Sequence, residues 1–468
     1  MDDYSLYEAH EFRGSWWLPA DETEPSPKKS GTLTYTPEEG LSLRLHGSLS
    51  NDFGRKTVTT YPLVLGEASG HPITLQSCVR THGEYGIGED GMESRESTVW
   101  ASRAFIGSHY VSADEITIER LFANIQHLGS WMWALPFDIQ TEKETKAYAV
   151  RIEMPDPIVA ELKNAGTVGI AHSRKGPNWN FSEGDLTVNV SPRMYYRPPD
   201  GASFDQAWPE IRRFQHFLTM ATGKPCQIIS VGGFRTKGDS EDETPSVARF
   251  IAVLFQPRDL LGDARPVHPS EMIFAFDDIS SNFGQYMSNW YAADDDMRTI
   301  QNLYFSTRYD SGMFIDNRFM YLVQALESYH GLRFDSLAMD DQEYKVGISN
   351  LIKGLPGDQF KQLVGQALAF GNRKSLFERL VELADQYGRV LTGAFGAGRD
   401  DFLRKVTKTR HYRTHFDPKG KKDVLEGAEL LQAYRLLRIM MECCFLVELG
   451  MDRDRAQDLL ARKANYFV

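Results

Sequence analysis

Arg410 and His415 are the two residues of this 468-residue chain whose types and spacing most clearly suggest chemistry. Four residues separate them in segment 408–415, which reads KTRHYRTH. An arginine supplies a fixed positive charge, and a histidine can take up or release a proton near neutral pH. These are the two groups that cleavage of RNA without a metal ion requires.

The spacing alone is a weak signal, because an Arg followed by a His after four to six residues arises often by chance. The chain contains four such pairs: Arg103/His109, Arg120/His127, Arg404/His411 and Arg410/His415. Context favours the last pair, because the first two lie in the predicted β-rich half, and Arg404/His411 would straddle the helix at whose end Arg410/His415 lies. Residues 399–422 also hold nine Lys or Arg and three Asp in a chain of net charge -12. Such a basic segment could attract an anionic substrate, although most charge runs are solvated helix faces.

Helix geometry constrains how these side chains can work together. Five residues along an ideal helix turn the side chain by about 500°, so Arg410 and His415 would point about 140° apart. They could converge only if the helix ends or distorts there, or if a second subunit completes the site. His411 and His415, at positions i and i+4, would share one face.

Three interpretations of this segment remain open. In a nuclease site, His415 would act as general acid or base, Arg410 would stabilise the phosphate, and His411 and Tyr412 would orient the backbone. In a metal site, His411 and His415 would bind an ion with Asp417 as third ligand, a spacing that lacks the Glu of H-E-x-x-H. In a structural role, the most frequent one for an isolated Arg/His pair, the residues would only pack and cap a helix end.

The elements that must position these residues fall into two regions. Short segments with strand-like patterns fill the N-terminal half: Leu41–His46, Tyr61–Leu65, Ile73–Val79, Ile116–Ile125, Ala147–Met154 and Leu186–Val190. A helix over Phe204–Met220 interrupts them, and two further strands are expected at Gln227–Gly232 and Ala248–Phe255. We therefore expect a sandwich-like or barrel-like β-rich region that contains a helix.

From residue 294 onward the periodicity is helical. The expected helices are Asp296–Thr307, Asn317–Gly331, Asp341–Lys353, Asp358–Phe370, Ser375–Tyr387, Arg399–Thr414, Asp423–Leu449 and Arg453–Asn465. The helix Asp423–Leu449 is apolar nearly all round in its second half, so it should form the buried spine of a bundle, packed against Asn317–Gly331. The fold class is thus α+β and multidomain, with a β-rich domain at 1–293, a further break near 195, and an all-α bundle at 294–468.

Composition sets the remaining expectations. We expect no signal peptide and no membrane span, because the first residues are acidic and the most apolar stretch is interrupted by Glu442 and Glu448. The four cysteines show no zinc-binding spacing, and the adjacent Cys443 and Cys444 should be buried free thiols. A cytoplasmic protein without a metal or other cofactor is the simplest prediction.

The C-terminal third resembles HEPN domains of the ApeA-like subgroup. The resemblance rests on residues 319–330, 375–380 and 409–417, and it includes the R-x4-6-H motif of HEPN nucleases. A polar residue, often Asn, follows the Arg in that family, and here the position is His411. Residues 12–19, 31–33, 41–47, 65–66 and 73–78 resemble the N-terminal domain of ApeA-like anti-phage proteins. Together the resemblance covers most of the chain.

The resemblance implies a metal-independent endoribonuclease that leaves a 2′,3′-cyclic phosphate. It would act on RNA as a homodimer or higher homo-oligomer through the HEPN domain, with motifs facing each other across the interface. It implies Arg410, His415 and His411 as catalytic residues, and Tyr412, Arg413, Lys408 and Glu327 as residues that contact or position the substrate. The implied role is bacterial defence by abortive infection, with the β-rich domain sensing a phage-derived trigger or restraining the nuclease.

Two other functions compete with this hypothesis. One is a non-catalytic HEPN scaffold that binds RNA or a nucleotide and signals through the N-terminal domain. The other is a carbohydrate-binding β module fused to a dimerisation bundle, in which Trp16, Trp17, Trp131 and Trp133 would stack on sugars. The presence of both Arg410 and His415 favours the enzyme, because a scaffold needs neither.

Overall fold

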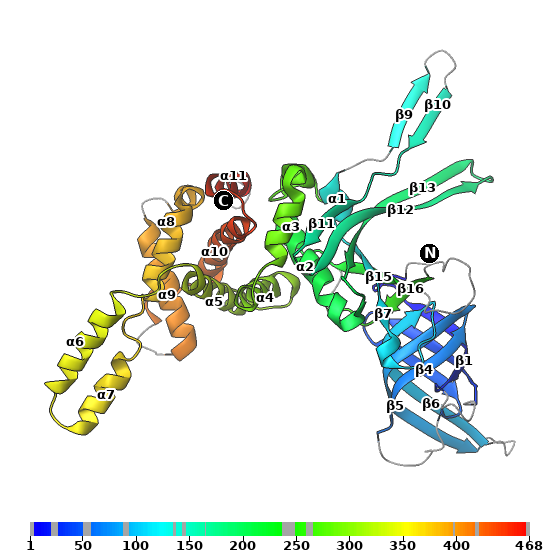
Figure 1. The fold of residues 1–468 in the computed structure, drawn as a ribbon, viewed down its shortest axis with the longest axis horizontal. Coiled ribbons are helices and arrows are strands. Elements are labelled where there is room, and N and C mark those ends of the chain that lie inside the picture. Colours follow the sequence, from blue (N-terminus) through cyan, green and yellow to red (C-terminus); the bar gives the residue numbers. More distant parts are fainter. Residues whose placement is uncertain are drawn as a thin grey trace. The chain divides into compact units, whose positions relative to one another are not determined.

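A computed structural model of the chain separates into two compact units, residues 1–291 and 292–468 (Figure 1). The structure describes residues 4–19, 27–49, 58–87, 93–133, 137–142, 147–163, 165–235, 249–258, 265–395, 398–416 and 421–464. The first unit is rich in strands and the second is helical, which confirms the predicted fold class.

Six antiparallel strands close into a barrel at the start of the first unit. They are β1 (His10–Trp17), β2 (Lys29–Thr36), β3 (Gly40–His46), β4 (Thr60–Ala68), β5 (His71–Ile87) and β6 (Glu93–Ile106). Their order is β6-β3-β2-β1-β4-β5, and the pairing of β5 with β6 closes the ring. Closure leaves none of these six strands as an open sheet edge.

Apolar and polar residues alternate along the barrel strands, and the apolar side chains fill the barrel interior. In β3, Leu41, Leu43 and Leu45 are buried while Arg44 between them is exposed. Trp16 is fully buried, and its ring lies so close to the backbone of β4 that a Cβ added at Gly66 would come within 2.2 Å of it. A side chain at position 66 would therefore displace the largest aromatic residue of the barrel core.

The barrel continues into a second set of strands through β6. These strands are β8 (Arg120–Ile125), β11 (Ile158–Leu162), β12 (Gly166–Asn180), β13 (Asp185–Arg197), β15 (Ile228–Arg235) and β16 (Arg249–Leu254), in the order β11-β12-β13-β8-β15-β16-β6. Two small sheets pair β9 (Phe137–Glu142) with β10 (Ala147–Ile152) and β7 (Thr117–Ile118) with β14 (Ala202–Ser203).

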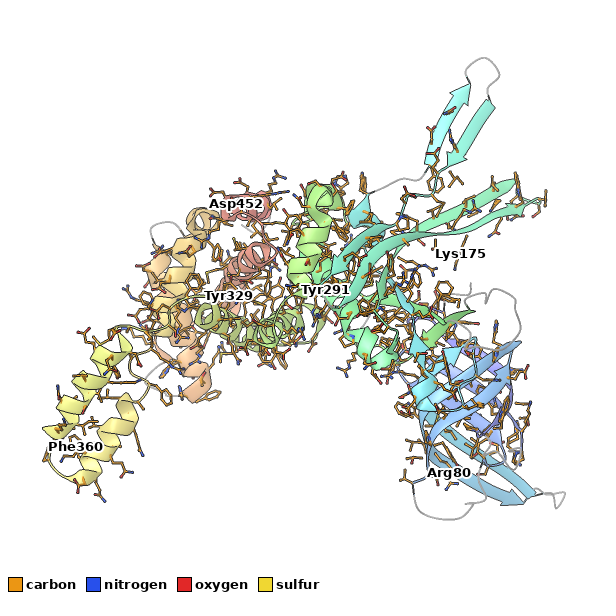
Figure 2. All side chains as sticks on the ribbon, in the orientation of Figure 1. Arg80, Lys175, Tyr291, Tyr329, Phe360 and Asp452 are labelled. Atoms are coloured by element: carbon orange, nitrogen blue, oxygen red, sulfur yellow. The ribbon has the colours of Figure 1, made fainter. Side chains whose placement is uncertain are left out.

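The outer halves of β12 and β13 form a two-stranded arm. Residues 171–180 and 185–193 are paired only with each other among the described residues. The arm includes Lys175, which is labelled in Figure 2. Near its tip the rings of Trp179 and Phe181 stack, with their centroids 6.3 Å apart. Trp179 is 62% exposed and Phe181 is 90% exposed.

Helix α2 (Phe204–Thr222) provides most of the helical core of this unit. Its first turn is closed by a capping box, in which the Ser203 side chain accepts from the Gln206 backbone and the Gln206 side chain accepts from the Ser203 backbone. Helices α1 (Leu128–Met132) and α3 (Phe283–Tyr291) complete the unit, and neither was predicted from the sequence. Trp131 of α1 is fully buried and packs on Phe217 of α2, so neither Trp131 nor Trp16 can serve as a sugar-stacking surface.

Eight described helices form the second unit: α4 (Asp295–Tyr309), α5 (Ile315–Arg333), α6 (Asp341–Lys353), α7 (Asp358–Leu368), α8 (Leu376–Phe395), α9 (Arg399–His415), α10 (Gly427–Glu448) and α11 (Arg453–Ala464). As predicted, α10 is the buried spine and packs on α5. Helices α6 and α7 contain no buried residue, and Phe360, labelled on α7 in Figure 2, is 48% exposed.

Several expected boundaries were wrong. The spine helix begins at Gly427 rather than Asp423, because Asp423 has a left-handed φ of 69° and Glu426, which precedes the helix, is extended. The predicted strand Ile116–Ile125 is broken into β7 and β8. The four cysteines are buried and free, as predicted for Cys443 and Cys444. None of the helices described is both long and apolar enough to cross a membrane.

Candidate functional site

Helix α9 carries the predicted motif, and its sequence explains where it begins and ends. Asp400 and Asp401 lie in its first turn, where carboxylates interact favourably with the helix dipole. One face, with Leu403, Val406 and Thr409, is buried. The helix runs to His415 and is capped by Phe416, which has a left-handed φ of 50°.

Thr409 anchors the middle of this helix. Its Oγ1 donates to the Lys405 carbonyl at 2.7 Å and accepts from the Leu425 backbone N–H at 2.9 Å. The residue is fully buried, so its hydrogen bond with Leu425 is shielded from water. This contact fixes the stretch of α9 that immediately precedes Arg410.

Arg410 is held by an acidic partner on α5. Its Nη2 donates to Glu327 Oε2 at 3.2 Å, and the two side chains are 34% and 28% exposed. The resemblance implied Glu327 as a residue that contacts or positions the substrate. The structure pairs it with Arg410.

His411 and His415 lie side by side at the exposed end of α9. Their ring centroids are 4.6 Å apart, as expected for positions i and i+4 on one helix face. Both residues are exposed, so an incoming ligand could reach either imidazole. A hydrogen bond from Thr414 Oγ1 to the Arg410 carbonyl at 2.8 Å continues the local packing of this last turn.

Arg410 and His415 are not brought together within one subunit. The helix continues through both residues, so their side chains leave it about 140° apart. No hydrogen bond or ion pair joins them among the residues that the structure describes. The two side chains could therefore act on one substrate only if one of them moves, or if a second copy of the chain supplies one of them.

The other predicted substrate contacts are already engaged within the unit. Arg413, 19% exposed, forms an ion pair with Asp316 at the start of α5 and donates to the Leu425 carbonyl at 3.3 Å. Burial lowers the pKa of Arg413. Lys408 Nζ lies 2.8 Å from Asp423 Oδ2. The ring centroids of Tyr412 and Phe416 are 6.2 Å apart. These contacts connect the helix with its surroundings.

The comparisons with known proteins identify the family of the chain. A family model described as ApeA N-terminal domain 1 matches residues 11–290, more than half of the chain, and one described as Apea-like HEPN matches residues 320–455. The chain belongs to the ApeA-like family. No curated protein and no solved structure matches it. The second match includes all seven residues that the sequence singled out, from Glu327 to His415.

The basic segment of the HEPN domain is largely neutralised by carboxylates. Besides Lys408, Arg410 and Arg413, two more cations of α9 have acidic partners: Arg399 with Asp385 and Asp400, and Lys405 with Asp401. Arg404 instead lies over the Phe377 ring at 5.0 Å. Four of these six carboxylates lie within 15 residues of their cations, and only Glu327 and Asp316, on α5, lie far along the chain.

A second polar cluster of the HEPN domain was missed from the sequence. His330 of α5 is fully buried, and one carboxylate, that of Glu382, lies 2.7 Å from both its Nε2 and Lys374 Nζ. Burial lowers the pKa of His330, although Glu382 opposes the shift. For Glu382, burial acts to raise the pKa, yet hydrogen bonds from Lys374 and His330 leave it lowered. This cluster links α5 with α8 and gives His330 a structural role.

The metal-site interpretation depends on a residue outside the described part of the chain. His411 and His415 are close enough to share a ligand, but Asp417, Pro418 and Gly420 lie outside the described residues. Within the ranges that are described, no group of three or more His, Cys, Asp or Glu side chains could hold a metal ion.

Proposed function

We propose that this ApeA-like protein is a metal-independent endoribonuclease whose active site is built around Arg410, His411 and His415. The observation that supports it most is the exposed pair of imidazoles at the end of α9, next to an arginine held by Glu327. The match to the Apea-like HEPN model adds support, because HEPN domains are typically nucleases.

The proposed chemistry is intramolecular attack by the ribose 2′-hydroxyl on the adjacent phosphorus. One histidine accepts the 2′-OH proton, the new O–P bond forms, and the bond to the 5′-oxygen breaks as that oxygen receives a proton. Arg410 stabilises the negative charge that develops on the phosphate oxygens. The products are a 2′,3′-cyclic phosphate end and a free 5′-hydroxyl end, so no water is consumed in this step.

The opposite directions of Arg410 and His415 support a site shared between two subunits. In a homodimer or higher homo-oligomer formed through the HEPN domain, the Arg410 of one copy would serve the His415 of another. Tyr412, with Lys408 and Arg413, would line the path of the RNA backbone. This arrangement removes the need to distort α9.

We further propose that the nuclease serves anti-phage defence by abortive infection in the cytoplasm. The β-rich unit would sense a phage-derived trigger or restrain the nuclease. This part rests on the family match alone, since fold does not determine function. Growth arrest on overexpression that disappears with His415→Ala would support the toxic role, and equal arrest by both proteins would contradict it.

The experiment that tests the activity is RNA cleavage by purified protein in EDTA, with end-group analysis of the products. The parent chain should give cyclic-phosphate ends, and His415→Ala should reduce the rate by a factor of about 10²–10⁴. His268→Ala is a matched control, because it removes another exposed imidazole, in the first unit. Cleavage that stops in EDTA would instead favour a metal site at His411 and His415.

A non-catalytic HEPN scaffold is the second candidate. The observation in its favour is that the Arg410 guanidinium already has a carboxylate partner, so it is only partly available to a phosphate. A scaffold would bind RNA without cleaving it, and His415→Ala would then bind as the parent does.

A further inference from the structure

A large cleft lies in the first unit, where the barrel meets α2. Its volume is about 880 Å³, within the range of pockets that hold small-molecule ligands. Strand β6 supplies Trp100, Ser102 and Arg103 to its wall, and the start of α2 supplies Phe204, Asp205 and Trp208. Neither the HEPN motif nor the proposed nuclease chemistry uses this cleft.

The position of the cleft follows from the pairing of β6. On one side of β6, residues 96–101 pair with β3 and residues 104–106 pair with β16. Ser102 and Arg103 lie between these two sets of pairings, where β6 passes from the barrel to the second set of strands. The opening is therefore built into the sheet and is not a gap between loose loops.

Aromatic side chains make up one wall. The rings of Phe204 and Trp208 stack with their centroids 5.5 Å apart, and the Phe255 ring meets Trp208 edge-on at a centroid distance of 5.0 Å. Trp100 lines the same cleft and is 36% exposed. Trp100 therefore offers a partly open aromatic face on which a flat heterocycle could stack.

The charged side chains that line the cleft favour an anion. Three arginines, Arg103, Arg212 and Arg258, face a single carboxylate, Asp205. Arg103 is already bonded to Asp205 through both guanidinium Nη atoms, at 3.1 and 2.5 Å. Arg258 is exposed and forms no ion pair with any described residue. The net positive charge suits a phosphate group.

Gln215 provides the observation that points to a specific ligand. Its side chain is 1% exposed and lines the cleft. Its Nε2 donates to the Cys226 carbonyl at 2.7 Å, which orients the amide, and its Oε1 has no hydrogen-bond partner. A buried acceptor left unpaired is unfavourable, so this oxygen is available to an N–H donor of a ligand.

We propose that this cleft binds a free nucleotide. The base stacks on Trp100 and donates a hydrogen bond from an amino or ring N–H group to Gln215 Oε1. The phosphate pairs with Arg258 and Arg212. This combination of a flat heterocycle, an N–H donor and an anion is what a nucleotide offers and what phosphate, a sugar or an acidic peptide does not.

The test is calorimetric titration of the full-length chain carrying His415→Ala, so that the RNA probe would stay intact if the chain is a nuclease. The probes are AMP, GMP, CMP, UMP, adenosine, inorganic phosphate and an RNA trinucleotide. We expect saturable binding of at least one mononucleotide. Trp100→Ala and Arg258→Ala should each weaken it about tenfold or more, because each removes a group that contacts the base or the phosphate.

Matched controls come from the arm of β12 and β13. Trp179→Ala and Arg174→Ala remove an exposed tryptophan and an exposed arginine outside the cleft and should leave the affinity unchanged. Gln215→Met should weaken nucleotides while leaving the weaker binding of inorganic phosphate in place. Gln215 is buried, so Gln215→Met could fail to fold. In that case Trp100→Ala and Arg258→Ala still test the proposal.

Several outcomes would overturn the proposal. They are no saturable binding of any mononucleotide, equal affinity for phosphate and nucleotide, and loss of affinity in the arm variants as large as in the cleft variants. Tighter binding of the trinucleotide than of every mononucleotide would assign the cleft to an RNA end instead. None of these readouts depends on RNA cleavage, so a failure here leaves the proposed nuclease untouched.

Discussion

Arg410 of α9 and Glu327 of α5 form an ion pair in which Nη2 lies 3.2 Å from Oε2. Both side chains are about one-third exposed, so the pair contributes little to stability. Its more specific effect is geometric, because it limits the rotamers open to Arg410, the first residue of the R-x4-H motif. The carboxylate also reduces the positive charge available to a phosphate.

We expect Glu327→Ala to lower RNA cleavage about tenfold, because Arg410 would lose its orientation. Glu327→Gln should retain most of the activity, since its amide oxygen can still accept from Arg410. Cleavage rates of the two variants, with melting temperatures close to that of the parent, check this. Equal losses in Ala and Gln would show that the charge matters rather than the hydrogen bond.

Mixing two inactive chains tests whether the site is shared between subunits. Arg410→Ala and His415→Ala should each be inactive alone. A mixed oligomer should recover up to about half of the parent rate per dimer, because one of its two sites combines an intact Arg410 with an intact His415. The measurement is cleavage after co-expression and purification through different tags. An inactive mixed oligomer of normal size would contradict a shared site.

The cations of α9 should differ in their importance for stability. Arg413→Ala removes a mostly buried guanidinium that bonds to Asp316 and to the Leu425 carbonyl, and it should destabilise the second unit by about 1–2 kcal/mol. Lys408→Ala removes an exposed pair with Asp423 and should leave the unfolding midpoint unchanged. Urea unfolding of both variants tests the contrast, and equal midpoints would show that Arg413 is not a structural residue.

The first unit should lose stability on acidification through His216. Burial and the neighbouring Arg212 and Arg213 lower the pKa of His216 to about 3. The unfolded chain, with a histidine pKa of about 6.5, therefore binds this proton more tightly than the folded chain. The contribution of neutral His216 is complete above about pH 6.5 and is lost as the pH falls toward 3, with a slope of at most about 1.4 kcal/mol per pH unit.

His216→Gln removes this titration and should flatten the dependence of stability on pH between 6.5 and 5. Denaturant unfolding at several pH values, for the parent and the variant, measures the difference. If both proteins lose stability in parallel over this range, His216 is protonated in the folded state and the expected shift is absent.

The sequence predicted the helical bundle well because its elements are local. The helix expected at Asp341–Lys353 has those bounds in the structure, and the apolar run after Gly427 identifies α10 as the spine. Periodicity of this kind depends only on neighbours three and four residues apart. The same reasoning placed His411 beside His415.

Long-range pairings could not be predicted in this way. The partners of Arg410 and Arg413 lie on α5, 83 and about 100 residues earlier in the chain, and no local pattern connects them. Barrel closure depends likewise on which strands pair. Strand β1 begins with polar residues, and β6 is long and mixed in composition, so neither has the strict alternation that marked β3.

The long strand β6 makes the barrel and the second set of strands a single hydrogen-bonded network. It contacts β5 along its length and passes from β3 to β16 at Ser102 and Arg103. A shift of this strand by one residue would turn Trp100 and Arg103 to the opposite faces and would break pairings in both parts at once. A distortion of β6 at the cleft would therefore disturb hydrogen bonds in both the barrel and the second set of strands.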